Sequence, residues 1–167
     1  AGNIVDAIAL TPKDHCLNIM PLFHIHGLIA VVLASMKAGA SVCCTPGFNA
    51  LKFLELATAA NPTWYSGVPT MHQAILLRAK RNADAIAKLH FRFVRSSSAS
   101  LPPAVFHELS KTFGCPVIEA YGMTEATHQM ASNPLPPKVQ KPGCVGLPAG
   151  PEIKIFLPDG SEASTGS

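Results

Sequence analysis

Short apolar segments alternate with helical segments along most of this chain, and this alternation restricts its fold more than any other feature. Five segments are typical of strands: residues 15–20, 40–44, 63–65, 91–95 and 116–120. Four segments favour helices, 27–37, 50–60, 69–81 and 103–113, and residues 3–10 favour the end of another helix. Strands and helices that alternate at such short spacing predict an α/β fold: a doubly wound, mostly parallel sheet with flanking helices.

Capping and breaking residues place the ends of these helices. Asn49 is a favourable N-cap, Pro69 suits the first turn of a helix, and Gly39 and Gly114 favour helix ends. The segment 27–37 is apolar on all sides, which predicts a fully buried helix.

The pattern of alternating strands and helices ends after Ala126, because prolines interrupt every long element. Residues 153–157 alternate and favour a β-strand. We therefore expect two parts, an α/β part over residues 1–133 and a Pro/Gly-rich loop with the beginning of a β subdomain over 134–167. The first residue is not methionine and the last element is incomplete, so we expect an internal fragment.

Composition excludes several classes of function. The 167 residues are 48% hydrophobic and 14% charged, and the net charge of +3 includes no basic block, which argues against a nucleic-acid partner. The longest apolar stretch is too short to span a bilayer, and no secretory signal is visible. Five isolated or adjacent cysteines favour reduced, core-packing thiols in an intracellular protein.

Three polar segments follow predicted strands, at 21–27, 96–100 and 121–125. In a doubly wound sheet the carboxyl ends of the strands border the ligand crevice, so we expect these segments to converge there. The segment 121–125 combines an aromatic ring, a glycine, a hydroxyl and a carboxylate, groups that suit a base, a close backbone approach, a phosphate and Mg²⁺. An ordinary strand-to-loop corner explains the same pattern equally well.

Three blocks, in order, resemble the adenylate-forming superfamily, which includes acyl-CoA synthetases and 4-coumarate–CoA ligases. Residues 121–126 (Tyr-Gly-Met-Thr-Glu-Ala) resemble its signature, 21–27 (Pro-Leu-Phe-His-Ile-His-Gly) its acyl-pocket motif, and 143–148 (Gly-Cys-Val-Gly-Leu-Pro) its downstream glycine–proline segment. The resemblance covers essentially the whole chain. It implies a parent enzyme, an AMP-forming acid–thiol ligase that uses ATP, Mg²⁺ and CoA to convert a small carboxylic acid into its CoA thioester through an acyl-adenylate.

The resemblance also implies roles for particular residues. Tyr121 would stack on adenine, Thr124 would contact phosphate and Glu125 would ligate Mg²⁺, which makes Thr124 and Glu125 the expected catalytic residues. The nucleotide would contact Ser98, Ala99, Ser100, Ala120, Tyr121, Gly122, Met123 and Thr124. The family's phosphate loop, ribose-binding aspartate and lysine-bearing C-terminal domain are absent from the sequence, so the piece by itself is expected to be inactive.

The acid pocket is expected to include His24, His26, Ser97, Ser98, His128 and Gln129. Unpaired buried donors would disfavour a long apolar chain by about 1–3 kcal/mol each, whereas a protonated His128 would pair with a second carboxylate. Because residues 125–130 also resemble the oxalyl-CoA synthetase branch, oxalate is the expected acid. For each of these residues the plainer interpretation is a helix cap, a polar turn or a packed side chain.

Other functions stay open. A medium-chain fatty acyl-CoA ligase or a 4-coumarate-like ligase would share the fold, and so would a non-catalytic nucleotide-binding α/β module. An amino-acid adenylation domain is disfavoured, because no acidic residue lies between Asp14 and Glu55 to pair with an ammonium group. We expect a cytoplasmic location, with a peroxisomal one as the alternative; the oligomeric state is not predicted.

Overall fold

The computed structural model describes residues 1–164, and its central feature is a sheet of seven strands in the order β2-β1-β3-β4-β5-β6-β7. The strands are β1 (His15–Asn18), β2 (Ser41–Cys44), β3 (Trp64–Gly67), β4 (Phe93–Ser96), β5 (Val117–Met123), β6 (His128–Ser132) and β7 (Leu147–Pro148). The pairs from β2 through β5 are parallel, whereas β5–β6 and β6–β7 are antiparallel. The predicted α/β class and mostly parallel sheet are confirmed.

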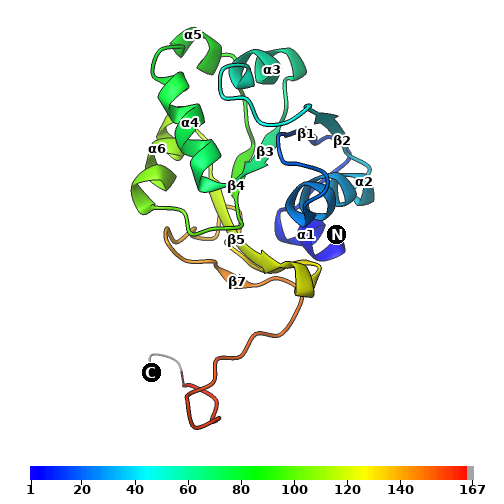
Figure 1. The fold of residues 1–167 in the computed structure, drawn as a ribbon, viewed down its shortest axis with the longest axis vertical. Helices are drawn as coiled ribbons and strands as arrows, with labels where there is room; N and C mark the ends of the chain where they lie inside the picture. Colours follow the sequence, from blue (N-terminus) through cyan, green and yellow to red (C-terminus); the bar gives the residue numbers. More distant parts are fainter. Residues whose placement is uncertain (165–167) are drawn as a thin grey trace.

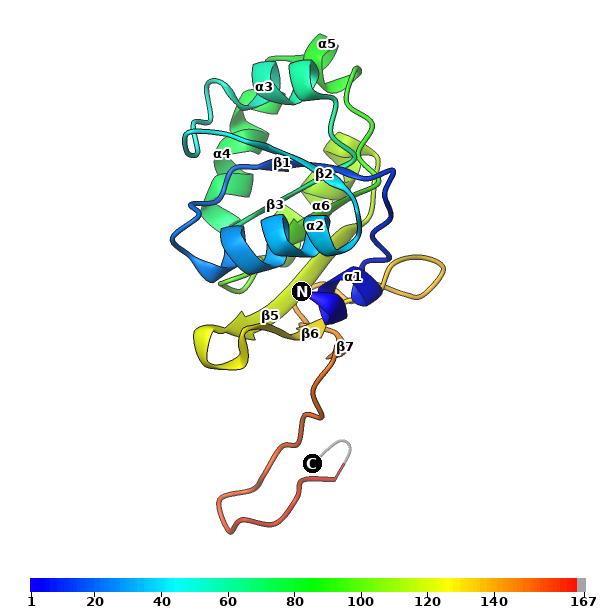
Figure 2. The same cartoon turned by 90° about the vertical axis from the view of Figure 1, so that its right-hand side faces the viewer.

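Helices cover both faces of the sheet (Figures 1 and 2). They are α1 (Gly2–Ala7), the π-helix η1 (His26–Leu33), α2 (Ala34–Lys37), α3 (Phe53–Ala60), α4 (Pro69–Ala79), α5 (Ala83–Ile86), α6 (Pro103–Phe113) and the 3-10 turn η2 (Thr124–Ala126). One core joins α3, α4 and α6 to one face of the sheet, and a second joins α1, η1 and α2 to the other. Trp64 and Phe93 belong to the second core while their neighbours Tyr65 and Val94 belong to the first, as the alternation along a strand requires.

The ends of several helices follow the expected local chemistry. Pro69 and Pro103 occupy first turns, and α6 ends at Gly114 in the left-handed region, with φ of 62°. Asn49 accepts hydrogen bonds from the backbone N–H groups of Leu51 and Lys52, at 2.9 and 3.3 Å. It therefore caps the turn that precedes α3 rather than α3 itself.

The helix expected over 27–37 is not fully buried, which corrects the prediction. Its first part is the π-helix η1, which buries one side while Leu28 and Leu33 on the other side are exposed, and Met36 of the following helix α2 is exposed too. Apolarity on all sides indicated burial on all sides, but only the sheet side is covered within the described residues. None of the helices over residues 1–164 is long and apolar enough to cross a bilayer.

The C-terminal part departs from the expected β structure. Residues 153–157, expected as a strand, contribute a single bridge from Phe156 to Glu162 within the described residues. The chain beyond β7 extends away from the sheet in both views (Figures 1 and 2). Without a neighbouring strand to pair with, an alternating segment has no ladder to form. The division of the chain into residues 1–133 and 134–167 stays a prediction. Residues 165–167 of the second part lie outside the described residues.

Candidate nucleotide and acid site

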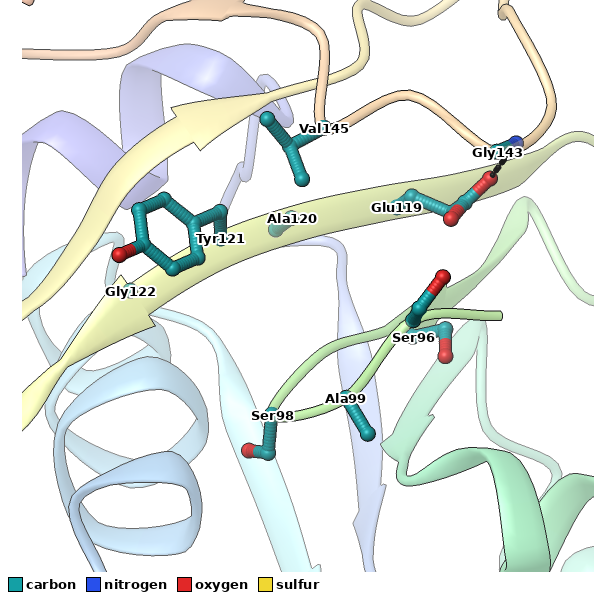
Figure 3. Close-up of a pocket in the computed structure, with 10 residues that line it drawn as sticks. Ser96, Ser98, Ala99, Glu119, Ala120, Tyr121, Gly122, Gly143 and Val145 are labelled. Carbon is teal, nitrogen blue, oxygen red and sulfur yellow. Dashed lines mark hydrogen bonds between the residues drawn. The ribbon is translucent and has the colours of Figure 1, made fainter. Parts of the chain in front are cut away.

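A cavity of about 300 Å³ opens at the carboxyl end of β4, beside the middle of β5 (Figure 3). Its walls are the end of β4 with the loop that follows, the middle of β5, and the segment that precedes β7. The lining residues are Ser96, Ser98, Ala99, Ser100, Glu119, Ala120, Tyr121, Gly122, Gly143 and Val145. This is the edge of the sheet at which doubly wound folds bind ligands, and two of the three predicted polar segments meet here.

The loop after β4 is held in a fixed shape by two neighbouring strands. The Ser97 hydroxyl donates to the Ala120 carbonyl at 2.8 Å, and the Ser97 N–H donates to the Gly67 carbonyl at 3.2 Å. Ser98 takes a left-handed conformation with φ of 73°, which is strained for a residue other than glycine. Ser97 therefore ties the loop to the sheet, and its hydroxyl is already engaged, while Ser98 faces the cavity edge.

The sequence 121–123 forms the end of β5 rather than the expected turn, and the turn begins at Thr124. Polar residues at the start of β6 gave no strand pattern, but β6 pairs with β5 and extends it. A Cβ atom at Gly122 would overlap the carbonyl group of His128, so this glycine is required by the close approach of the two strands. Tyr121 stays 40% exposed on the cavity wall.

A buried carboxylate that sequence reasoning missed anchors the third wall. Glu119, on β5, accepts a hydrogen bond from the Gly143 N–H at 2.8 Å (Figure 3). Burial raises the pKa of Glu119, and the hydrogen bond from Gly143 opposes that rise. Asn133 adds a donated bond to the Cys144 carbonyl at 2.7 Å. These two hydrogen bonds hold the glycine–proline segment, residues 143–148, across the cavity. The signal in the sequence for the anchoring role of Glu119 was an acidic residue within an apolar strand.

A cluster of polar side chains lies beside the cavity, under η1. His26 is fully buried, with Nε2 2.6 Å from Ser66 Oγ and Nδ1 3.0 Å from Ser98 Oγ. The ring of His128, from β6, lies 5.5 Å from the His26 ring. Ser98 belongs both to this cluster and to the cavity lining, so it connects the two.

Both histidines of the cluster are neutral near pH 7. Burial, followed by the charge of Arg95, lowers the pKa of His26 well below 6.5. The same causes, in the same order, lower the pKa of His128 to about 3. The expected protonated His128 is therefore wrong, because a buried ring beside a cation does not take up a proton.

The positive charge of the cluster belongs to Arg95 on β4, which was not among the predicted site residues. Its side chain is 0% exposed and donates to Ser66 Oγ at 3.3 Å and to Gln129 Oε1 at 3.2 Å. Burial lowers the pKa of Arg95 to about 10, which leaves it cationic at neutral pH. The burial of Arg95 could have been predicted from the alternation of side chains along β4, because Arg95 lies on the same face as the buried Phe93.

The structure gathers some of the predicted residues and leaves others apart. Of the nucleotide-contacting set, Ser98, Ala99, Ser100, Ala120, Tyr121 and Gly122 line the cavity. Met123 and Thr124 lie further along the β5–β6 hairpin, outside the lining. His24 is exposed, and its Nδ1 accepts a hydrogen bond from the His26 N–H at 3.1 Å.

Glu125 lies exposed in η2, at the tip of the hairpin. Among residues 1–164 no group of three histidine, cysteine, aspartate or glutamate side chains is arranged to hold a metal ion. A single carboxylate fits a Mg²⁺ ion whose remaining ligands are phosphate oxygens and water, which is the usual arrangement for this metal at a nucleotide. It does not fit a metal held by protein ligands alone.

Comparison with known proteins agrees with this architecture. The family model of the AMP-binding enzymes matches residues 2–167. An oxalate–CoA ligase of Saccharomyces cerevisiae is 46% identical over 92% of this chain and 28% of its own length. An oxalate–CoA ligase of Arabidopsis thaliana is 48% identical over 92% of this chain and 30% of its own. The crystal structure of ATP-bound MatB from Rhodopseudomonas palustris superimposes with a TM-score of 0.86 at 30% identity, covering 99% of this chain and 32% of that one.

The chain belongs to the AMP-binding enzyme family. It spans less than a third of the length of these relatives. The cavity between the loop after β4 and the middle of β5 is thus a candidate nucleotide site within that family's fold, and the buried polar cluster next to it is a candidate acid site.

Proposed function

We propose that this chain is the central part of the AMP-binding domain of an ATP-dependent acid–CoA ligase, and that its acid is oxalate. One observation carries the proposal: Ser98 joins a nucleotide-sized cavity to a buried cluster of imidazole, hydroxyl and guanidinium groups. The similarity to two oxalate–CoA ligases over most of the chain supports it.

The cavity walls suit an adenosine moiety. Tyr121 offers a half-exposed ring for stacking on adenine, and the loop 98–100 forms the opposite wall with small side chains and backbone groups. Gly143, which has no Cβ atom, leaves the backbone open to close approach on the third wall. Phosphate oxygens would then point along the hairpin toward the Thr124 hydroxyl and the Glu125 carboxylate.

The chemistry requires that two anions meet, the acid carboxylate and the α-phosphate of ATP. Mg²⁺ bound by Glu125 and the phosphates would neutralise charge on the transferring group. The chain itself contributes orientation, since the loop after β4 is tied to β3 and β5 and holds Ser98 at the junction of the two sites. In-line attack depends on this positioning more than on proton transfer. CoA would then accept the acyl group.

The acid cluster is small, polar and positively charged, which favours oxalate over an apolar acid. Arg95 supplies the charge, and His26, Ser98 and His128 place polar groups next to it, with Ser98 at the edge of the cavity. An alkyl chain placed here would leave several of these groups without partners, at about 1–3 kcal/mol each.

The test is a substrate profile of the full-length ligase that contains this chain. Initial rates of AMP formation with CoA would be measured for oxalate, 4-coumarate and a medium-chain fatty acid. We expect oxalate to be preferred, and His128→Ala to raise the oxalate KM by about tenfold or more while sparing the medium-chain acid. His107→Ala, an exposed position on α6, is the matched control. A preference for either apolar acid, or an equal loss for all acids in His128→Ala, would reject oxalate. ATP binding without AMP formation from any acid would point to a non-catalytic module.

A further inference from the structure

Within residues 1–164, Arg95 is a buried cation that forms no ion pair with a carboxylate. Among residues 1–164 the ion pairs join other residues, and the hydrogen-bond partners of Arg95 are the neutral side chains of Ser66, His26 and Gln129. Its Nε has no partner among the described residues. An uncompensated charge in the interior is costly, and buried charges in proteins are usually paired or bound to a counter-ion. A fold that retains it has a use for the charge.

The guanidinium of Arg95 sets the direction of the hydrogen bonds in this cluster. A guanidinium only donates, so Ser66 Oγ accepts from Arg95. Arg95 Nη1 also directs a donor at His26 Nε2, at 3.5 Å, which favours the neutral tautomer with Nε2 unprotonated. Ser66 Oγ then donates its hydrogen to that nitrogen, at 2.6 Å. The proton of that ring therefore lies on Nδ1, which donates to Ser98 Oγ at 3.0 Å.

The far end of this chain of hydrogen bonds is at the cavity. Because Ser98 Oγ accepts from His26, its own hydrogen is left to donate to an acceptor outside the cluster. Ser98 lies on the cavity edge (Figure 3), and its left-handed backbone, with φ of 73°, keeps it there. Nearby, His128 Nδ1 is a second buried polar atom without a partner among the described residues. A ligand with acceptor oxygens and negative charge would satisfy the hydroxyl and offset the cation.

We propose that Arg95 is a positioning residue that selects acids carrying a second anionic group. It acts through Ser66 and His26, which fix the Ser98 hydroxyl as a donor to that group, and its charge supplies the attraction that neutral histidines cannot. This inference rests on the proposed function and assigns acid specificity within it to a residue that does not line the cavity. The ligand class is a small dicarboxylate or a similar doubly anionic acid.

The experiment uses the full-length ligase with Arg95→Met, which removes the charge at similar volume, and Arg95→Lys, which keeps it. Oxalate and acetate are compared, since they differ chiefly in the second anionic group. We expect Arg95→Met to lower kcat/KM for oxalate by about tenfold to a hundredfold, mainly through KM, with acetate changed by about threefold or less. Arg95→Lys should recover part of the oxalate activity. Arg78→Met, on α4 and away from the cluster, is the control for loss of an arginine.

A second variant and a stability measurement separate positioning from damage to the fold. Ser66→Ala keeps the charge but interrupts the hydrogen-bond chain, and it should raise the oxalate KM less than Arg95→Met does. The Tm of Arg95→Met should stay within a few degrees of the wild type, because removal of an unpaired buried charge offsets the hydrogen bonds that Ser66 and Gln129 lose. Loss of oxalate and acetate activity in parallel, together with a lowered Tm, would mean that Arg95 is only structural and would overturn the inference. An unchanged oxalate KM would overturn it too.

Failure of the inference and failure of the proposed function are distinguishable. If the wild type activates malonate but not oxalate, the oxalate proposal fails, and the inference holds when Arg95→Met loses malonate selectively. If the wild type prefers acids with one anionic group, both fail. If no acid is activated, the inference about Arg95 is tested by the rise in the Tm of the wild type when oxalate is added. The inference then requires this rise to be larger than that with acetate and to disappear in Arg95→Met.

Discussion

The buried histidine of α4 makes the fold sensitive to acid, and the size of this effect follows from its burial. His72 is 0% exposed, and its Nδ1 lies 3.1 Å from the Tyr65 hydroxyl. Burial lowers the pKa of His72 from 6.5 to about 4. Between these two values the unfolded chain binds a proton that the folded chain does not, so stability falls as the pH falls through this window. At about 1.4 kcal/mol per pH unit, the loss between pH 7 and pH 4 is about 3 kcal/mol.

The perturbation is His72→Gln, which keeps a partner for Tyr65 and does not titrate. Urea unfolding of wild type and variant would be followed by the fluorescence of Trp64, the single tryptophan of the chain, at several pH values from 7 to 4. The difference in unfolding free energy between the two should shift by about 3 kcal/mol in favour of the variant as the pH falls. Taking the difference cancels the contributions of His26 and His128, which titrate in both proteins. His107→Gln should track the wild type at every pH.

A difference that stays constant between pH 7 and pH 4 would refute the reasoning. It would mean that His72 takes up its proton as readily in the folded chain as in the unfolded one. Burial against Tyr65 and the sheet would then not exclude the charged ring, and the assignment of neutral rings to the polar cluster would lose its physical basis.

Two further predictions concern positions that hold the site in place. Gly122→Ala should destabilise the chain by about 2–4 kcal/mol, because its Cβ would overlap the His128 carbonyl and separate β5 from β6. An unfolding free energy in urea within about 0.5 kcal/mol of the wild-type value would contradict this close approach. Asp14→Asn should cost about 2 kcal/mol, because Asp14 pairs with Arg92 Nε at 2.9 Å and accepts from Thr63 Oγ1 at 2.9 Å, although Arg92 is partly exposed and screened. Burial raises the pKa of Asp14, but the hydrogen bond from Arg92 and further hydrogen bonds outweigh it and hold this pKa below its usual value. The stability advantage of the wild type over Asp14→Asn should therefore shrink as the pH falls below about 4. A stability advantage that is independent of pH would count against the ion pair.

The parallel core of this fold could be predicted from local pattern, whereas the charge and the hydrogen bonds of the acid cluster could not. The family resemblance predicted four of its members, His26, Ser98, His128 and Gln129, but not Arg95 or Ser66. Apolar strands bounded by proline and glycine, such as 63–65 and 116–120, are specified by their own residues. The strand β6 is not, since its polar start at His128 becomes a strand only through pairing with β5. Tertiary pairing overrides local propensity at such positions.

Arg95 and Glu119 were missed for a related reason. Each lies within an apolar strand, where an ionisable side chain is taken for a surface residue unless the alternation of faces is followed. The functional interest of both positions comes from partners distant in sequence, Ser66 and Gly143. These contacts exist only once the sheet is assembled. The sequence therefore predicted most residues of the cavity wall but not the positive charge of Arg95 beside it.

The most direct measurement is a crystal structure of the full-length ligase bound to a non-hydrolysable analogue of oxalyl-adenylate. The account predicts adenine against Tyr121 and the loop 98–100, with the distal carboxylate of the oxalyl group accepting from the Ser98 hydroxyl, next to His26 and His128. An analogue bound with its adenine outside this cavity, or with its distal carboxylate turned away from Ser98, would contradict the account.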